Sequence, residues 1–403
     1  MKQPVISAPK SSRRRRVGIL AASLLIAGCG AGAGSVLLPR AADGQAGTTT
    51  QQQRWRDAAN VFVSVPVPDA RPLARPKSEA PAGLQFKIDQ LVRGFNGKAG
   101  AAIVAVDEGW SVESGGTLSL PQQSVSKLWV AMTVLSQRDA GRLKLDDPVL
   151  VTREDLTLFH QPIAGLVTGS GYQTTIGALM TRALTQSDNT ANDRLLTYVG
   201  GPAAVRAFIA EKQLGAIRFG PGERLLQAGT AGLTWTQSMA YGRGFEAARA
   251  RLDPAVRAAA FQRYVTSPPD GAAPLAIADA LARLARGELL SETSTRILME
   301  TMSHTVTGRA RLKAALPGGW ELAHKTGTGQ DLKGRNAGFN DVGIITAPDG
   351  RRYALAVMIG DTTAPIRERQ FLIQNVASAL TGATPLRPIT IAGSAGIEAE
   401  GTD

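Results

Sequence analysis

The segment SVSKLWVAMTVL, residues 124–135, places a serine and a lysine three positions apart in front of an apolar run. That run is apolar enough to form a buried helix. Ser124 would lie at the start of this helix, with Lys127 one turn further along on the same face. This geometry suits nucleophilic catalysis, because the lysine can take or relay the serine proton and the helix N-terminus favours developing negative charge. A capping serine beside an exposed lysine is the alternative interpretation.

Two further motifs follow along the chain. Ser187-Asp188-Asn189 comes after a helical segment, and Lys325-Thr326-Gly327 comes after a strand-like one. Ordered S-x-x-K, S-D-N and K-T-G motifs are the signature of penicillin-recognising serine enzymes. On these motifs the sequence resembles the class A β-lactamases over about residues 82–382. The resemblance implies a monomeric serine hydrolase that acts on a small β-lactam substrate and needs neither a metal nor an organic cofactor.

A deacylating carboxylate distinguishes class A enzymes from their relatives, and Glu223 is the candidate here. It lies 36 residues after Ser187, a spacing similar to that in the family. Gln227 falls where the family usually has an asparagine that shares the hydrolytic water. Residues 234–240 look like a variant of the helix start that follows this loop. A surface glutamate is the alternative interpretation of Glu223.

The resemblance also implies how the reaction is divided among residues. Ser124 attacks the lactam carbonyl, and backbone N–H groups of Ser124 and Thr328 form the oxyanion hole. Lys127 and Glu223 share the proton transfers of acylation, and the glutamate serves deacylation. Ser187 passes a proton to the departing lactam nitrogen, with electrostatic support from Lys325.

Four residues complete the implied substrate site. Asn189 hydrogen-bonds the amide of the substrate side chain, and the hydroxyl groups of Thr326 and Thr328 contact the substrate carboxylate. Gly327 keeps the strand edge open for the ligand. Phe159 or His160 forms a wall of the cleft, unless this stretch is simply a packed loop.

Four features depart from the family pattern. Val342 stands where the family often carries a carboxylate-binding arginine, and Pro221 stands where an arginine usually forms a salt bridge in the loop of Glu223. An insertion at 241–269 predicts one more helix, within 244–264. Gln227 is one methylene longer than the asparagine usual in the family, and this difference predicts slow deacylation. Four arginines are candidates to replace the missing one, namely Arg309, Arg311, Arg367 and Arg369.

Apolar periodicity predicts the fold. Residues 101–106 fit a buried strand behind a helical pattern at 84–95. Residues 341–346 and 353–359 are two more strand-like runs, joined by a turn sequence that predicts a hairpin. The segments between them are mostly helical, as at 274–287. We therefore predict an α/β (α+β) fold of the DD-peptidase/β-lactamase-like type, with a mostly antiparallel sheet flanked by helices and an inserted all-helical lobe.

The two ends of the chain differ from this catalytic region, which we place at residues 82–382. Residues 1–38 combine an arginine run with an uncharged apolar stretch, which is typical of an export signal. Cys29 ends a lipobox-like sequence, which favours a lipoprotein signal. An uncleaved anchor and an ordinary cleaved signal are the two alternatives. Each places the catalytic region in the periplasm or elsewhere outside the cytoplasm, with membrane contact only through this segment. Residues 39–81 have linker composition and 383–403 that of a frayed tail.

Charge and composition argue against two other classes. Six of the twelve net positive charges precede residue 29, and the remaining arginines are scattered among few aromatic residues, which disfavours nucleic-acid binding. One cysteine and three separated histidines disfavour a zinc hydrolase.

Two alternatives share the three motifs with a β-lactamase. One is a penicillin-binding DD-peptidase acting on peptidoglycan stem peptides. The other is a β-lactam sensor that stays acylated. Hydrolysis of β-lactams is the leading hypothesis.

Overall fold

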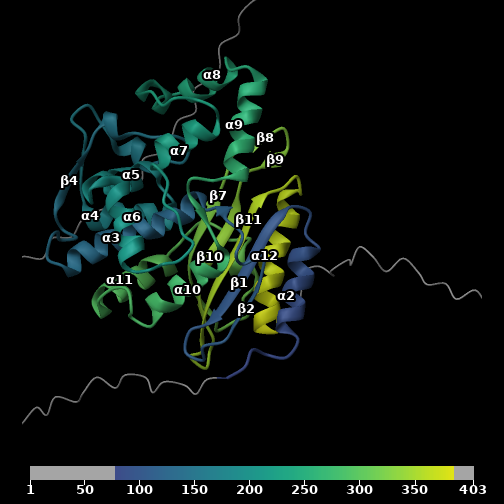
Figure 1. Cartoon of the computed structure of the whole chain (residues 1–403). Helices are drawn as coiled ribbons and strands as arrows, with labels where there is room; N and C mark the ends of the chain where they lie inside the picture. Colours follow the sequence, from purple (N-terminus) through teal and green to yellow (C-terminus); the bar gives the residue numbers. More distant parts are fainter. Residues whose placement is uncertain (1–77, 385–403) are drawn as a thin grey trace, which may run out of the picture. The chain divides into compact units, whose positions relative to one another are not determined.

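A five-stranded antiparallel sheet organises residues 78–384, which are the residues that the computed structural model describes (Figure 1). Its strand order is β2-β1-β11-β10-β7. These strands are β1 (Lys98–Ala105), β2 (Ser111–Ser114), β7 (Glu321–Thr328), β10 (Phe339–Thr346) and β11 (Arg352–Asp361). Two strands precede the helical part of the chain and three follow it, so the predicted antiparallel sheet with an inserted helical lobe is confirmed.

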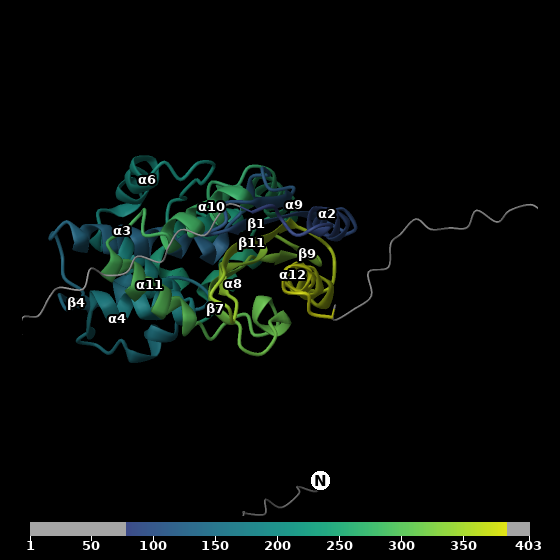
Figure 2. The same cartoon turned by 90° about the horizontal axis from the view of Figure 1, so that it is seen from below.

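Alternation along β11 explains why helices cover both faces of the sheet. Successive side chains of a strand point to opposite faces, and every residue of β11 between its two ends is buried. Ala354, Ala356 and Met358 join the core that includes α10 (Pro274–Ala285). Their neighbours Leu355, Val357 and Ile359 join a second core, formed with α2 (Leu84–Arg93) and α12 (Ile366–Thr381). Figure 2 shows α10 and α12 on opposite sides of the sheet.

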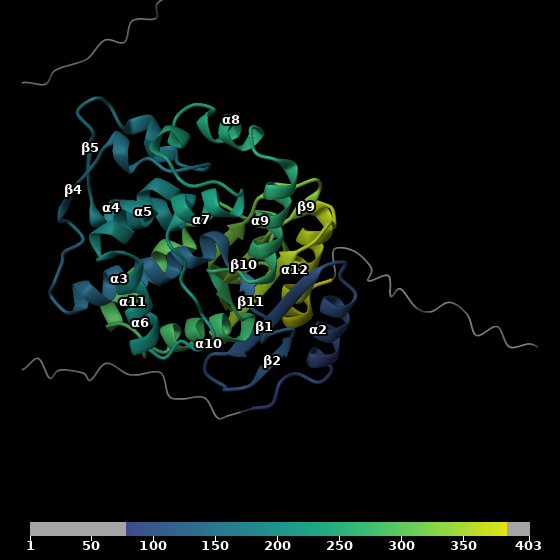
Figure 3. The ribbon, with the colours of Figure 1, turned by 45° about the horizontal axis from the view of Figure 1, so that its top comes forward.

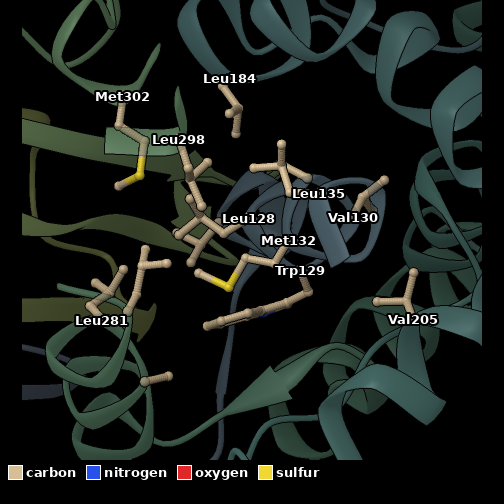
Figure 4. Close-up of a cluster of buried hydrophobic side chains, with 14 of the residues drawn as sticks. Leu128, Trp129, Val130, Met132, Leu135, Leu184, Val205, Leu281, Leu298 and Met302 are labelled. Atoms are coloured by element: carbon tan, nitrogen blue, oxygen red, sulfur yellow. The ribbon is translucent and has the colours of Figure 1, made fainter. Parts of the chain in front are cut away.

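The helical lobe is built around α3 (Lys127–Asp139), whose first nine residues are all buried. Figure 4 shows its apolar side chains among those of the surrounding elements, including Leu184, Val205, Leu281 and Leu298. The other helices of the lobe are α4 (Ile176–Thr181), α5 (Asn189–Tyr198), α6 (Gly201–Glu211) and α11 (Glu292–Ser303). Burial on all sides fixes α3, and with it the residues at its start, relative to the sheet.

Short strands connect the lobe to the sheet and to its own loops. The paired short strands are β3 (Leu120–Pro121) with β6 (Gly271–Ala272), β4 (Pro148–Val151) with β5 (Tyr172–Thr175), and β8 (Asp331–Leu332) with β9 (Arg335–Asn336). The pair β3–β6 lies beside the nucleophile motif, and the pair β8–β9 follows the K-T-G strand.

The insertion and the residues directly before it both differ from their predictions. The insertion contains two helices, α8 (Gly244–Ala250) and α9 (Pro254–Thr266), where the sequence predicted one. Asp253 accepts the N–H of Ala255 at 2.7 Å and so caps a new helix that begins at Pro254, a residue that has no N–H to continue the old one. Residues 234–240 were also misassigned. They end in a 3₁₀ turn, Gln237–Ala240, directly before the insertion, and the helix that follows the loop onto the sheet is α10.

The inserted helices therefore lie inside the loop that begins with Glu223. The chain leaves through α7 (Glu223–Thr230) and returns at β6, which pairs with β3 directly before the nucleophile motif. Helix α9 packs between α7 and the β8–β9 hairpin (Figure 3). The apolar residues that join these three elements are Leu226, Phe261, Tyr264, Val265 and Ala337, with Leu332 beside them. The loop is thereby a packed subdomain with its own small core.

Several predictions concern residues outside those described. These are the export segment 1–38 with Cys29, nearly all of the linker 39–81 and most of the tail 383–403. Among the described helices, none combines the length and the apolar character needed to cross a membrane.

Candidate active site

Ser124 and Lys127 meet at the start of α3. A 3₁₀ turn, Gln123–Ser126, leads into the helix and presents Ser124, whose Oγ accepts a hydrogen bond from Lys127 Nζ at 2.6 Å. The same ammonium group donates to Asn189 Oδ1 at 2.8 Å and contacts the carboxylate of Glu223. Lys127 is only 1% exposed, and a charge so deeply buried requires such partners. One lysine thus connects the nucleophile, the S-D-N motif and the candidate base.

Asp193 of α5 positions Glu223. Its Oδ1 accepts the N–H of Glu223 at 2.8 Å and its Oδ2 accepts the N–H of Arg224 at 3.1 Å, so it caps α7 from another helix. Gly222 occupies the N-cap position of α7 at a φ of +98°, where a Cβ would lie 2.9 Å from a methyl group of Leu196. Burial, and then the charge of Glu223, raise the pKa of Asp193. This contact holds the loop in place of the salt bridge that Pro221 precludes.

Gln227 lies one turn after Glu223, and its amide already has protein partners. Its Nε2 is 3.4 Å from Glu223 Oε2 and donates to Gln123 Oε1 at 3.1 Å, while its Oε1 accepts from Gln330 Nε2 at 3.0 Å. The longer side chain therefore reaches past the carboxylate to two other glutamines.

Gln123, directly before the nucleophile, is a site residue that the sequence reasoning missed. Its φ of +54° is unusual for a residue with a side chain. The backbone N–H donates to Asp270 Oδ2 at 2.8 Å, and Nε2 donates to the Tyr264 hydroxyl at 2.7 Å. Two consecutive glutamines in front of an otherwise apolar helix were the available signal, because buried amides need defined partners.

The second and third motifs meet at Ser187 and Lys325. A π-helical turn, Arg182–Gln186, ends at Ser187, which adopts the left-handed conformation. Ser187 Oγ accepts a hydrogen bond from Lys325 Nζ at 2.9 Å. Burial, and next the positive charge of Lys127, hold the pKa of Lys325 well below its usual value. A lysine that releases its proton readily is thus in contact with the serine of the S-D-N motif.

Arg311 is the one of the four candidate arginines that lines the cleft. It donates to the Gly327 carbonyl at 2.9 Å and to Thr328 Oγ1 at 2.6 Å, and its guanidinium lies 3.7 Å from the centre of the Phe339 ring. Burial lowers the pKa of Arg311 to about 10, so it remains cationic at neutral pH. The other three do not line the cleft: Arg309 and Arg367 are exposed, and Arg369 is buried against Ala364.

Ser124, Ser187 and Arg311 open onto a cleft of about 520 Å³. Phe159 and His160 form part of its wall, so the cleft-wall interpretation of that stretch holds. The lining includes residues from all three motifs, from α7, from α8 and from the β7–β8 turn: Ser124, Ser187, Asn189, Gln227, Arg249, Thr326, Thr328, Gly329, Gln330 and Asp331. A carbonyl substrate in this cleft can reach Ser124, and the buried Lys127 and Lys325 contact the two lining serines, Ser124 and Ser187.

Comparison with known proteins agrees with this geometry. Residues 83–384 match the model of the beta-lactamase enzyme family. The extended-spectrum beta-lactamase PER-1 of Pseudomonas aeruginosa is 32% identical over 73% of this chain and 85% of its own length. The chain belongs to the beta-lactamase enzyme family. Beta-lactamase VEB-1 of the same organism is 26% identical over 73% of this chain and 88% of its own. A solved beta-lactamase structure from Chitinophaga pinensis has a TM-score of 0.61 at 26% identity, covering 74% of this chain and 98% of that one.

Two residues of this class A β-lactamase have contacts that differ from those expected. A Cβ at Gly327 would lie 2.4 Å from the Gln122 carbonyl oxygen, so the glycine admits the nucleophile turn against β7 rather than opening the strand edge to a ligand. Asn189 is 5% exposed and bonds Lys127 through Oδ1 and the Leu158 carbonyl through Nδ2, at 2.9 Å. Asn189 therefore orients the lysine, whatever its contact with substrate.

Proposed function

We propose that this class A serine β-lactamase hydrolyses the lactam amide through an acyl-enzyme on Ser124, and that Glu223 activates the water for deacylation. The triple contact of Lys127 with Ser124, Asn189 and Glu223 carries this assignment. A proton can leave Ser124 along this contact and reach the carboxylate without crossing bulk solvent.

Acylation follows from the two serine–lysine pairs. Lys127 first gives a proton to Glu223, and Ser124 Oγ then bonds to the lactam carbonyl carbon as its own proton passes to the neutral Lys127 amine. In the alternative route, the Ser124 proton passes through a water directly to Glu223. The carbon–nitrogen bond then breaks, and the nitrogen takes a proton from Ser187, which Lys325 replaces. The lowered pKa of Lys325 and its 2.9 Å contact with Ser187 support this last step. Backbone N–H groups of Ser124 and Thr328 are the proposed oxyanion donors.

Deacylation requires a water between Glu223 and the ester carbon. Glu223 would take the water proton as the oxygen attacks, and Ser124 would leave with a proton returned through Lys127. The Gln227 amide is already hydrogen-bonded to Gln123 and Gln330. It is therefore less available to hold this water, which supports a slow deacylation step.

The substrate carboxylate has a proposed site on the other side of Ser124. Arg311 and Thr328 are already hydrogen-bonded to each other, and Thr326 lies on the same strand with its hydroxyl 2.8 Å from that of Thr307. A guanidinium beside hydroxyl groups is a suitable receptor for a carboxylate. Arg311 thus takes the role expected of an arginine at position 342.

Intact-protein mass spectrometry of a protein that comprises residues 78–403 tests this assignment. With a chromogenic cephalosporin, the wild-type protein should show a transient adduct and continuing product release. Ser124→Ala should show neither, whereas Glu223→Gln should form an adduct that persists. Steady turnover by Glu223→Gln at the wild-type rate would refute the role of Glu223. A stable wild-type adduct that releases no product would instead favour the sensor, and D-Ala release from a stem peptide would favour the DD-peptidase; family membership favours neither.

We also infer that the catalytic region is exported as a monomer. The arginine run and apolar stretch of residues 1–38 support export, and the lipobox-like position of Cys29 favours a lipid anchor. Fractionation of cells expressing the full chain and its Cys29→Ala variant tests this: a lipoprotein should move from the membrane fraction when Cys29 is replaced. Retention in the membrane would favour the uncleaved anchor.

A further inference from the structure

Helix α8 of the insertion brings an arginine to the cleft. Phe245 is 2% exposed and packs with Leu158, Ala231 and Met239, which anchors α8 against the loop that follows β4 and the end of α7. Its ring meets that of Phe159 edge-on, with 4.9 Å between the ring centres. Arg249 lies one helical turn after Phe245, on the same face, and lines the cleft.

The guanidinium of Arg249 is available to a ligand. It lies 5.2 Å from the centre of the Phe245 ring, which orients it. In residues 78–384, no carboxylate comes within 4 Å of its nitrogens, whereas Arg224, Arg335 and Arg352 each have such a partner. A half-buried cation beside a ligand cleft, without an anionic partner from the protein, favours an anion from the ligand.

The covalent structure of a β-lactam indicates which part of the substrate lies nearby. The ring carboxylate is attached next to the lactam nitrogen, and therefore on the side of Ser187, Lys325 and Arg311. The acylamino side chain is attached next to the carbonyl carbon, and therefore extends the opposite way. Asn189 is the expected partner of the amide in that side chain. It donates a hydrogen bond to the Leu158 carbonyl, and the neighbouring Phe159 contacts Phe245 of α8.

We propose that Arg249 is a specificity-determining residue that binds an anionic group on the acyl side chain of the substrate. This inference rests on the acyl-enzyme assignment above. Arg249 belongs to the insertion, so the same loop that supplies Glu223 also selects among side chains. Substrates with a side-chain carboxylate or sulfonate gain this contact, and neutral side chains do not.

Benzylpenicillin and carbenicillin provide the test, because they differ by one side-chain carboxylate. In Arg249→Gln, kcat/KM for carbenicillin should fall about three- to tenfold, mainly through KM, while that for benzylpenicillin should change less than twofold. Arg249→Lys should recover part of the loss. Raising the salt concentration should reduce the preference for carbenicillin in the wild-type enzyme but not in Arg249→Gln. Arg251→Gln, an exposed arginine at the end of the same helix, is the matched control and should leave both substrates unchanged.

An unchanged ratio between the two substrates in Arg249→Gln would overturn the proposal, as would an equal loss for both, which would mean that Arg249 only supports α7. Failure of the proposed function has a different signature, because the wild-type protein would then release no product from benzylpenicillin. In that case acylation rates measured by intact mass replace kcat/KM in the same comparison, and the ratio still decides.

Discussion

Replacing Asp270 with asparagine should remove a pH dependence of folding stability between about pH 4 and pH 6. Asp270 is 1% exposed, and its Oδ2 accepts hydrogen bonds from the Gln123 N–H at 2.8 Å and the Tyr264 hydroxyl at 3.1 Å. Its Oδ1 is buried with no hydrogen-bond partner among the described residues. Burial raises the pKa of Asp270 from 3.8 to about 6 in spite of the two donated hydrogen bonds.

The folded protein therefore binds the Asp270 proton more tightly than the unfolded chain does. The contribution of this group to stability is greatest below pH 3.8, falls as the pH rises to about 6, and stays low above that. A difference of about two pKa units corresponds to about 3 kcal/mol. Asparagine has no proton to lose in this range, so Asp270→Asn should lack this decline.

Urea unfolding at pH 4, 5, 6 and 7.5 measures the effect. The free energy of unfolding of Asp270→Asn, relative to wild type, should rise by about 2 to 3 kcal/mol from pH 4 to pH 7.5. Other titrating groups are common to both proteins and cancel in the difference. Asp279→Asn, at an exposed position on α10, is the control and should follow wild type at every pH. Parallel curves for Asp270→Asn and wild type would show that burial does not perturb this carboxyl group, and would refute the reasoning.

Three further predictions concern the residues around the reacting groups. Asp193→Ala should lower the free energy of unfolding by about 3 kcal/mol, because it leaves two N–H groups of α7 without their charged acceptor. The same change should slow deacylation more than acylation. Equal effects on both steps in rapid-quench kinetics would contradict a specific role of Asp193 in placing Glu223. Arg311→Gln should raise KM for benzylpenicillin about tenfold or more with a smaller change in kcat, and an unchanged KM would exclude Arg311 from carboxylate binding. Gln227→Asn should speed deacylation severalfold, because the shorter amide cannot reach both Gln123 and Gln330 and is free to hold a water. If the acyl-enzyme of this variant accumulates to the wild-type level, Gln227 does not limit deacylation.

The parts of the fold that the sequence predicted are those with strong local signals. The strands β1 and β11 are nearly continuous apolar runs, and α10 is bounded by a proline and a glycine. The strand β10 contains the shorter apolar group Val342, Ile344 and Ile345. The insertion gave a weaker signal because its helices are rich in alanine and arginine, so that α8 and α9 merged into one predicted helix. The return of the loop at β6 depends on pairing between two-residue strands, β3 and β6, and no periodicity can reveal so short a ladder.

The residues of the site also divide into those with a local sequence signal, which were predicted, and those that depend on distant contacts, which were not. Ser124, Lys127, Ser187 and Lys325 occur in motifs whose spacing is fixed by local geometry, and the structure brings them together. Asp193 and Gln123 act through contacts with residues 30 and 147 positions away, and neither lies in a motif. The sequence left four arginines open as carboxylate ligands, because the choice depends on which loop folds over β7 beside Phe339. Contacts between distant segments are what the sequence could not supply.

The loop of Glu223 is connected to the nucleophile through Gln123. A residue held at a φ of +54° stores backbone strain of about 1 to 3 kcal/mol and persists only where its surroundings fix it. Here those surroundings are Tyr264 and Asp270 of the loop, Gln227 of α7 and the Ala337 carbonyl of the β8–β9 hairpin. Because Gln123 directly precedes Ser124, a shift of α9 would be transmitted to the nucleophile as well as to the base. The inserted helices therefore bear on acylation and on deacylation together, and not only on the shape of the cleft.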